Sequence, residues 1–205
     1  MSMDPRPLQY WLSPQLSQAG QSETTVLRVM ANNYSARRAT YLMMAGWGSW
    51  LLVLAVLLAA ANLAPALWGS LAGIGLALGG TALLLRSHHL KNPLASYRRW
   101  VSSRAPRTVN GAVTALALFM IFMCGFILFS LFYGASRSIT AGDVIGSVMA
   151  GLFMANTLLV PAWHSEHAGA IFRRHIQNSP EARRQLEDLA LHGTDPKGPE
   201  KFGPL

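Results

Sequence analysis

The chain has little charge, almost no cysteine and few acidic residues. Only 13% of its 205 residues are Asp, Glu, Lys or Arg, and 51% are hydrophobic, whereas about a quarter of the residues in a soluble domain are charged. The high hydrophobicity excludes intrinsic disorder. The single cysteine, Cys124, excludes a disulfide within the chain and paired-thiol redox chemistry. The composition therefore indicates a membrane protein.

Recognisable catalytic signatures are also missing. The sequence has no GxxxxGK[ST] loop for a nucleotide, no GxSxG nucleophile turn and no HExxH helix. Ion-coupled transporters and voltage sensors need ionisable side chains at membrane depth, and the long apolar runs contain none. We therefore expect no catalytic residues, no cofactor and no coupled transport.

Four runs without Asp, Glu, Lys, Arg or His are long enough to cross a bilayer. They cover residues 41–63, 66–85, 109–133 and 144–163, and a hydrocarbon core of about 30 Å needs about 20 helical residues. Asn62 and Pro65 predict a tight turn between the first two runs. The sequence therefore predicts an all-α integral membrane protein with four transmembrane helices and cytoplasmic interfacial helices.

The basic residues lie almost entirely on one side of these spans. All but one of the 17 Lys and Arg residues belong to the amino-terminal flank, the loop over residues 86–108 or the carboxy-terminal tail; the exception is Arg137. Lys and Arg accumulate in cytoplasmic loops. We therefore expect a multi-pass inner (plasma) membrane protein with both termini in the cytoplasm. The same rule accounts for the net charge of +8, so no nucleic-acid partner is predicted.

This topology divides the chain into three regions. Residues 1–40 form a cytoplasmic amphipathic flank, whose helix runs along the membrane surface or directly into the first span. Residues 41–163 form the four-helix membrane domain. Residues 164–205 form a helical tail that is disordered at its end. In the loop between the second and third spans, Trp100 with Arg98 and Arg99 predicts a helix lying in the membrane interface.

Small residues recur at helical spacing in the second and fourth spans. Transmembrane helices associate where small side chains let two backbones approach closely. Packing within the chain and contact with a partner both remain open, because the second span carries two such faces. The predicted helix-packing residues are Gly69 and Gly73 on one face, Gly75 and Gly79 on the other, and Ser147, Gly151, Ala155 and Asn156 in the fourth span.

Large rings follow one side of the third span. Their spacing alternates between three and four residues, which keeps them on one face of a helix. The rings could fill the grooves that glycines open on the second or fourth span, or could face lipid or a partner protein, and such a stripe is more often used for packing than for a cofactor. It comprises Ala112, Ala115, Phe119, Phe122, Phe126, Phe129 and Tyr133.

Four histidines near the ends of the second and fourth spans are weak candidates for a metal or haem site. They are His88, His89, His164 and His167, with Glu166 as the nearby carboxylate. Interfacial histidines otherwise contact headgroups or helix-terminal carbonyls, and the neighbouring arginines oppose a divalent cation. We therefore expect no bound metal.

These observations favour a non-enzymatic protein that acts through helix packing and protein contact. Its expected partners are the lipid bilayer, other membrane proteins and a second copy of the chain. The expected role is that of an accessory or scaffold subunit of a membrane assembly, such as a bacterial secretion or conjugation machine, or in the exclusion of such a machine. The alternatives are a small oligomeric channel or transporter subunit with Asn156 at its axis, and a metal or haem protein that uses the helix-end histidines.

Overall fold

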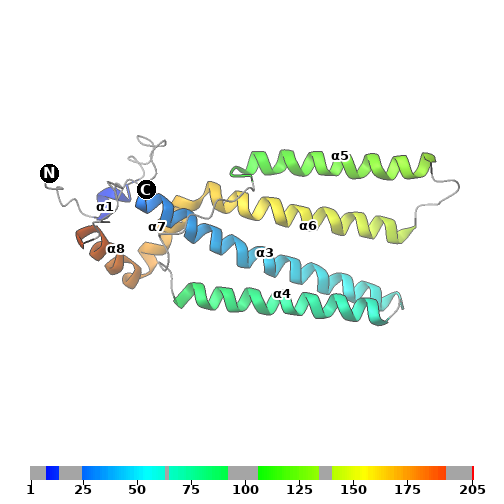
Figure 1. Ribbon diagram of the computed structural model, residues 1–205, viewed down its shortest axis with the longest axis horizontal. Helices are drawn as coiled ribbons and strands as arrows, with labels where there is room; N and C mark the ends of the chain where they lie inside the picture. The colour runs from blue at the N-terminus through cyan, green and yellow to red at the C-terminus, as the bar shows by residue number, and fades with distance from the viewer. Residues whose placement is uncertain (1–7, 14–24, 63–64, 92–105, 134–139, 193–204) are drawn as a thin grey trace. The chain divides into compact units, whose positions relative to one another are not determined.

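The computed structural model describes residues 8–13, 25–62, 65–91, 106–133, 140–192 and 205, and regular structure within them is helical throughout. Four helices are long and apolar enough to cross a membrane, α3 to α6, which confirms the predicted all-α membrane fold. The helices are α1 (Leu8–Trp11), α3 (Val26–Ala60), α4 (Pro65–Lys91), α5 (Val109–Tyr133), α6 (Ala141–Glu166), α7 (Ala168–Asn178) and α8 (Pro180–His192) (Figure 1).

The chain divides into two compact units. Unit 1 takes its described residues from Met1–Arg37, His89–Ser103 and His167–Leu205, and unit 2 takes them from Arg38–His88 and Arg104–Glu166. Two helices contribute to both units, since α3 supplies residues 26–37 to unit 1 and α4 supplies residues 89–91. Different interactions stabilise the two units: contacts between lipid-exposed helices in unit 2 and a buried hydrophobic core in unit 1.

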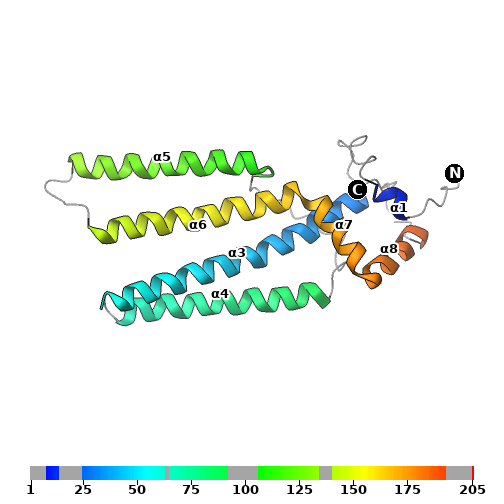
Figure 2. The same cartoon turned by 180° about the vertical axis from the view of Figure 1, so that it is seen from behind.

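Unit 2 contains the membrane-crossing parts of four helices side by side in the order α4, α3, α6, α5 (Figures 1 and 2). The helices α5 and α6 form one pair, and α3 approaches α4 on one side and α6 on the other. Many large apolar side chains of this unit are exposed, and the described apolar residues that are buried in it are alanines. This distribution is inverted relative to a soluble bundle because lipid, unlike water, favours apolar side chains.

Local sequence signals set the helix ends in unit 2. Asn62 adopts a left-handed φ of 54° and ends the turn after α3, a conformation that asparagine tolerates better than most residues. Pro65 then begins α4, as predicted. At the start of α6, Thr140 Oγ1 accepts a bond from the Asp143 backbone N–H and the Asp143 carboxylate accepts one from the Thr140 N–H, which is a capping box.

Glu166, at the end of α6, caps the neighbouring helix α5. Its Oε2 accepts a 2.7 Å hydrogen bond from the backbone N–H of Val109, the first residue of α5. Helix amino termini leave N–H groups unsatisfied and carry partial positive charge, which favours a carboxylate there. Glu166, which the sequence offered as a possible metal ligand, thus links the end of α6 to the start of α5 by a hydrogen bond.

Helix α3 is longer than its predicted span. It runs without a break over Val26–Ala60, whereas the apolar run predicted a span from residue 41. At 1.5 Å per residue its 35 residues extend for roughly 50 Å, well beyond a hydrocarbon core. The amphipathic helix of the flank therefore leads directly into the first span, the second of the two predicted arrangements.

Unit 1 has a hydrophobic core that the sequence did not predict. Its buried side chains come from segments at both ends of the chain, and the backbone N–H of Leu205 donates to the Trp11 carbonyl at 3.1 Å. The flank and the tail appeared too short to bury a core separately, but their apolar faces complete one another. The core consists of Leu8, Leu27, Met30, Ala31, Tyr34, Phe172, Ile176, Leu186 and Leu205.

The helical pair α7 and α8 supplies one wall of this core. The two helices meet at Ser179, whose extended backbone ends α7 and whose Oγ accepts a hydrogen bond from the Ala182 N–H in the first turn of α8. Pro180 follows as the first residue of α8, a position that proline favours. Trp100, Arg98, Arg99 and the tail end over residues 193–204 lie outside the described residues.

Candidate functional site

The closest helix crossing in unit 2 joins α3 and α4 at glycine. A Cβ added to Gly48 would lie 2.8 Å from the Gly75 carbonyl oxygen and 3.0 Å from the Gly79 backbone nitrogen. A Cβ on Gly75 would in turn lie 3.0 Å from the Gly48 carbonyl oxygen. Both contacts are with backbone, which cannot move aside as a side chain can. The backbone of α4 at Gly75 and Gly79 is therefore approached by Gly48 of α3, although a Cβ on Gly79 itself would meet nothing within 4 Å in the described part of the chain.

The other small-residue face of α4 is open. A Cβ on Gly69 or Gly73 would meet nothing within 4 Å in the described part of the chain. Ala77 and Thr81 continue this row at four-residue spacing and are exposed as well. The Thr81 hydroxyl donates to the Ala77 carbonyl of its own helix at 2.8 Å. We call Gly69, Gly73, Ala77 and Thr81 the outer ridge.

The fourth-span residues have three different environments. A Cβ on Gly151 would lie 3.3 Å from the Met120 Sδ of α5, so this glycine faces the neighbouring helix. The hydroxyl of Ser147 donates to the Asp143 carbonyl one turn earlier. Ala155 is half-buried. The predicted ladder therefore has one position, Gly151, at which the structure shows a contact with another helix.

Asn156 joins α6 to α3 through the backbone. Its Nδ2 donates to the Met43 carbonyl oxygen at 2.9 Å. The space for its side chain exists because residue 46 is glycine, since a Cβ there would lie 2.5 Å from the Asn156 Oδ1. In the same contact, Trp47 Nε1 donates to Thr157 Oγ1 at 3.1 Å and the Trp47 ring stacks on Phe153. Polar and aromatic contacts thus hold these two helices together.

The ring stripe of α5 has members in different environments. Its first member, Ala112, is fully buried and Phe119 is half-buried, but Phe122 is 71% exposed and Phe129 is exposed as well. Phe122 and Phe129 thus correspond to the alternative of rings that face lipid or a partner protein. The Cβ position of Gly151 on α6 faces Met120 of α5. The two rings face the surroundings of the bundle.

The four candidate histidines are divided between the units. His89 and His167 belong to unit 1, and His88 and His164 belong to unit 2. His164 Nδ1 bonds with the Val160 carbonyl at 2.9 Å, one turn earlier in its own helix, which requires the proton to be on Nδ1. Among the residues that the structure describes, no group of three His, Cys, Asp or Glu side chains is placed to hold a metal ion.

Two sets of contact residues were missed by the sequence reasoning. Gly46 and Gly48 of α3 make the closest approaches in unit 2, and their i, i+2 spacing does not fit the four-residue pattern of a small-residue ladder. Their position on either side of Trp47 was the sequence feature that could have indicated a helix contact here. Tyr34 and His175, which lie in unit 1, were missed because their contact joins segments more than a hundred residues apart in the chain.

Comparison with known proteins adds no assignment. The chain matches no protein-family model, and neither a curated protein nor a solved structure is significantly similar to it.

Proposed function

We propose that this protein is a non-enzymatic subunit of a membrane assembly, in which it acts as an accessory or scaffold through contacts between transmembrane helices. The observation that carries this proposal is the outer ridge of α4. A Cβ on either of its two glycines would meet nothing within 4 Å in the described part of the chain, while Gly75 on the opposite side contacts Gly48 of α3. A helix of a partner protein would gain the same close backbone approach on the outer ridge.

The exposed rings of α5 support contact with a partner as well. Phe122 and Phe129 lie on one side of a helix whose other side packs on α6. Aromatic side chains are well suited to fill the grooves that small residues open on a facing helix. The protein therefore offers a partner helix two kinds of surface, the small residues of the outer ridge and the exposed rings of α5.

The engagement of Asn156 favours this function over an oligomeric pore. A conducting path needs polar groups turned toward its axis, and the amide nitrogen of Asn156 is bonded to the Met43 carbonyl within the chain. We also propose a wider role, either as a subunit of a bacterial secretion or conjugation machine or as a protein that excludes such a machine. This wider role is proposed only by analogy with other small multi-span membrane proteins.

Substitution at the outer ridge tests the proposal. Gly73→Leu should weaken capture of partner proteins from the native membrane by roughly tenfold or more, because a leucine separates the two helices over several turns. Leu83→Ala is the matched control, since Leu83 is 67% exposed and lies on another side of the same helix. Capture is measured by crosslinking in the membrane and quantitative mass spectrometry. Equal partner recovery from the two variants would contradict the proposal.

We also propose that the protein lies in the inner membrane with both termini in the cytoplasm, because of the distribution of Lys and Arg. Reporter fusions test this topology. A reporter active only in the periplasm should be inactive when fused after Arg99 and active when fused after Ser138. The opposite pattern would reverse the topology.

A further inference from the structure

Unit 1 contains a buried stack of three rings from three helices. The Tyr34 ring of α3 lies 4.6 Å from the His89 ring of α4 and 4.5 Å from the His175 ring of α7, between ring centroids. The His175 ring is nearly parallel to Tyr34, at 22°. Phe172, one turn before His175, contacts the same tyrosine at 5.9 Å. The stack therefore fastens α7 to the other two helices.

The two imidazoles are close to one another and shielded from water. Since each lies within 5 Å of Tyr34, their centroids are separated by at most about 9 Å. Tyr34 and His89 are buried, with exposed fractions of 8% and 5%, and His175 is half-buried. At this distance and burial, two positive charges repel one another strongly, because little water lies between them to screen them.

The charged side chains on the helices of the stack are all of one sign within unit 1. The three helices that form the stack contain no Asp or Glu. Their other titratable groups within unit 1 are basic or neutral: Arg28 and Arg37 on α3, Lys91 on α4, and Arg173 and Arg174 on α7; Tyr10 lies on α1.

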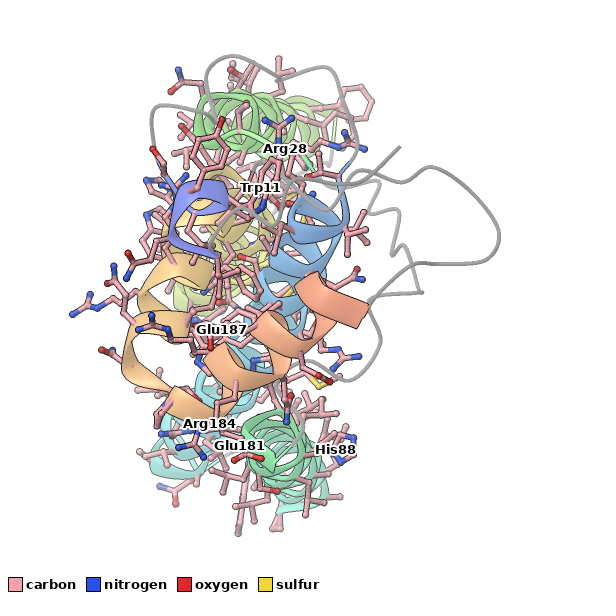
Figure 3. All side chains as sticks on the ribbon, turned by 90° about the vertical axis from the view of Figure 1, so that its left-hand side faces the viewer. Trp11, Arg28, His88, Glu181, Arg184 and Glu187 are labelled. Atoms are coloured by element: carbon pink, nitrogen blue, oxygen red, sulfur yellow. The ribbon has the colours of Figure 1, made fainter. Side chains whose placement is uncertain are left out.

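Acidic side chains within the described part of unit 1 lie on α8. They are Glu181, Glu187 and Asp188, beside Arg183 and Arg184 of the same helix, and the carboxylate of Glu187 pairs with Arg183 at 2.9 Å. Figure 3 shows Glu181, Arg184 and Glu187 on α8. The charged side chains on the three helices of the stack within unit 1 are thus basic, and the described acidic side chains of the unit lie on α8.

We propose that this His89, Tyr34 and His175 stack is a proton-sensitive joint, which releases α7 when both imidazoles are protonated. Histidine changes charge near pH 6.5. A single imidazolium is attracted by the face of the tyrosine ring. A second imidazolium is repelled by the first and by the basic side chains of the same helices. Stability from the stack is therefore present above this pH and is lost as the pH falls.

Hydrogen exchange of the full-length protein in lipid nanodiscs tests the joint without any partner. On lowering the pH from about 7.5 to about 5.5, the protection of α7 amides, corrected for the intrinsic exchange rate, should fall roughly tenfold or more. In the double variant His89→Phe, His175→Phe, which keeps rings but removes the protons, the loss should be less than about twofold. His88→Phe, an exposed neighbour on α4, should retain the wild-type response.

Two results would contradict the proposal of a proton-sensitive joint. One is α7 protection in the wild-type protein that does not change between the two pH values. The other is an unaltered pH response in the double variant. If the double variant does not fold, each single variant is examined, and histidine resonances of the wild-type protein are followed by NMR. Titration of both imidazoles while α7 remains protected would likewise exclude the proposal.

Discussion

Replacing Gly48 by leucine should destabilise the membrane unit by on the order of 3 kcal/mol, the upper end of the range for overpacking. The reason is that its Cβ would lie 2.8 Å and 3.0 Å from backbone atoms of α4, and backbone cannot give way without separating the two helices. Thermal and denaturant unfolding of the purified protein in mixed micelles measures the effect.

The matched control is Gly73→Leu, which adds the same side chain to the open face of α4. Nothing lies within 4 Å of its Cβ, so the unfolding free energy of the isolated protein should change by less than about 0.5 kcal/mol, as for other exposed sites. Equal destabilisation by the two substitutions would mean that the α3 and α4 crossing does not limit stability. It would also mean that the outer ridge is occupied within the folded chain.

Replacing Phe172 by alanine should cost unit 1 about 3 to 5 kcal/mol. Phe172 is fully buried and contacts Tyr34 within a core assembled from both ends of the chain. Loss of the ring leaves a cavity bordered by helices that are not neighbours in sequence. Hydrogen exchange of α7 and α8 in nanodiscs should show the loss of protection directly.

Phe122→Ala provides the comparison for this substitution. The residue type is the same, but Phe122 is 71% exposed on α5, and its removal exchanges one lipid contact for another. We expect no change in the protection of unit 1 and less than about 0.5 kcal/mol in the unfolding of unit 2. A small effect of Phe172→Ala, comparable with that of Phe122→Ala, would show that the unit 1 core does not contribute to stability.

Fold class and helix positions could be predicted because they depend on local chemistry. The run over residues 109–133 coincides with α5, since every backbone group in lipid must be paired and a helix is the local way to achieve it. The turn at Asn62, the start of α4 at Pro65 and the end of α7 at Asn178 likewise follow from backbone preferences of single residues.

Orientation of each helix face could not be predicted in the same way. The two glycine rows of α4 have equivalent spacing, and only the approach of Gly48 from α3 decides that Gly75 lies inside while Gly73 remains outside. The α5 rings illustrate the same limit. In water the apolar side of a helix turns inward, but in lipid an apolar ring is accommodated on either side.

By itself the sequence determined that this chain has four membrane-crossing helices and where their turns lie, because both depend on the apolarity and backbone preferences of contiguous residues. Only the tertiary structure decided that α3 continues into unit 1 and that Leu8, Phe172 and Leu205 share a core. Neither end of the chain is long enough to bury a core separately. Their association depends on complementary surfaces formed by residues far apart in sequence, which no local pattern records.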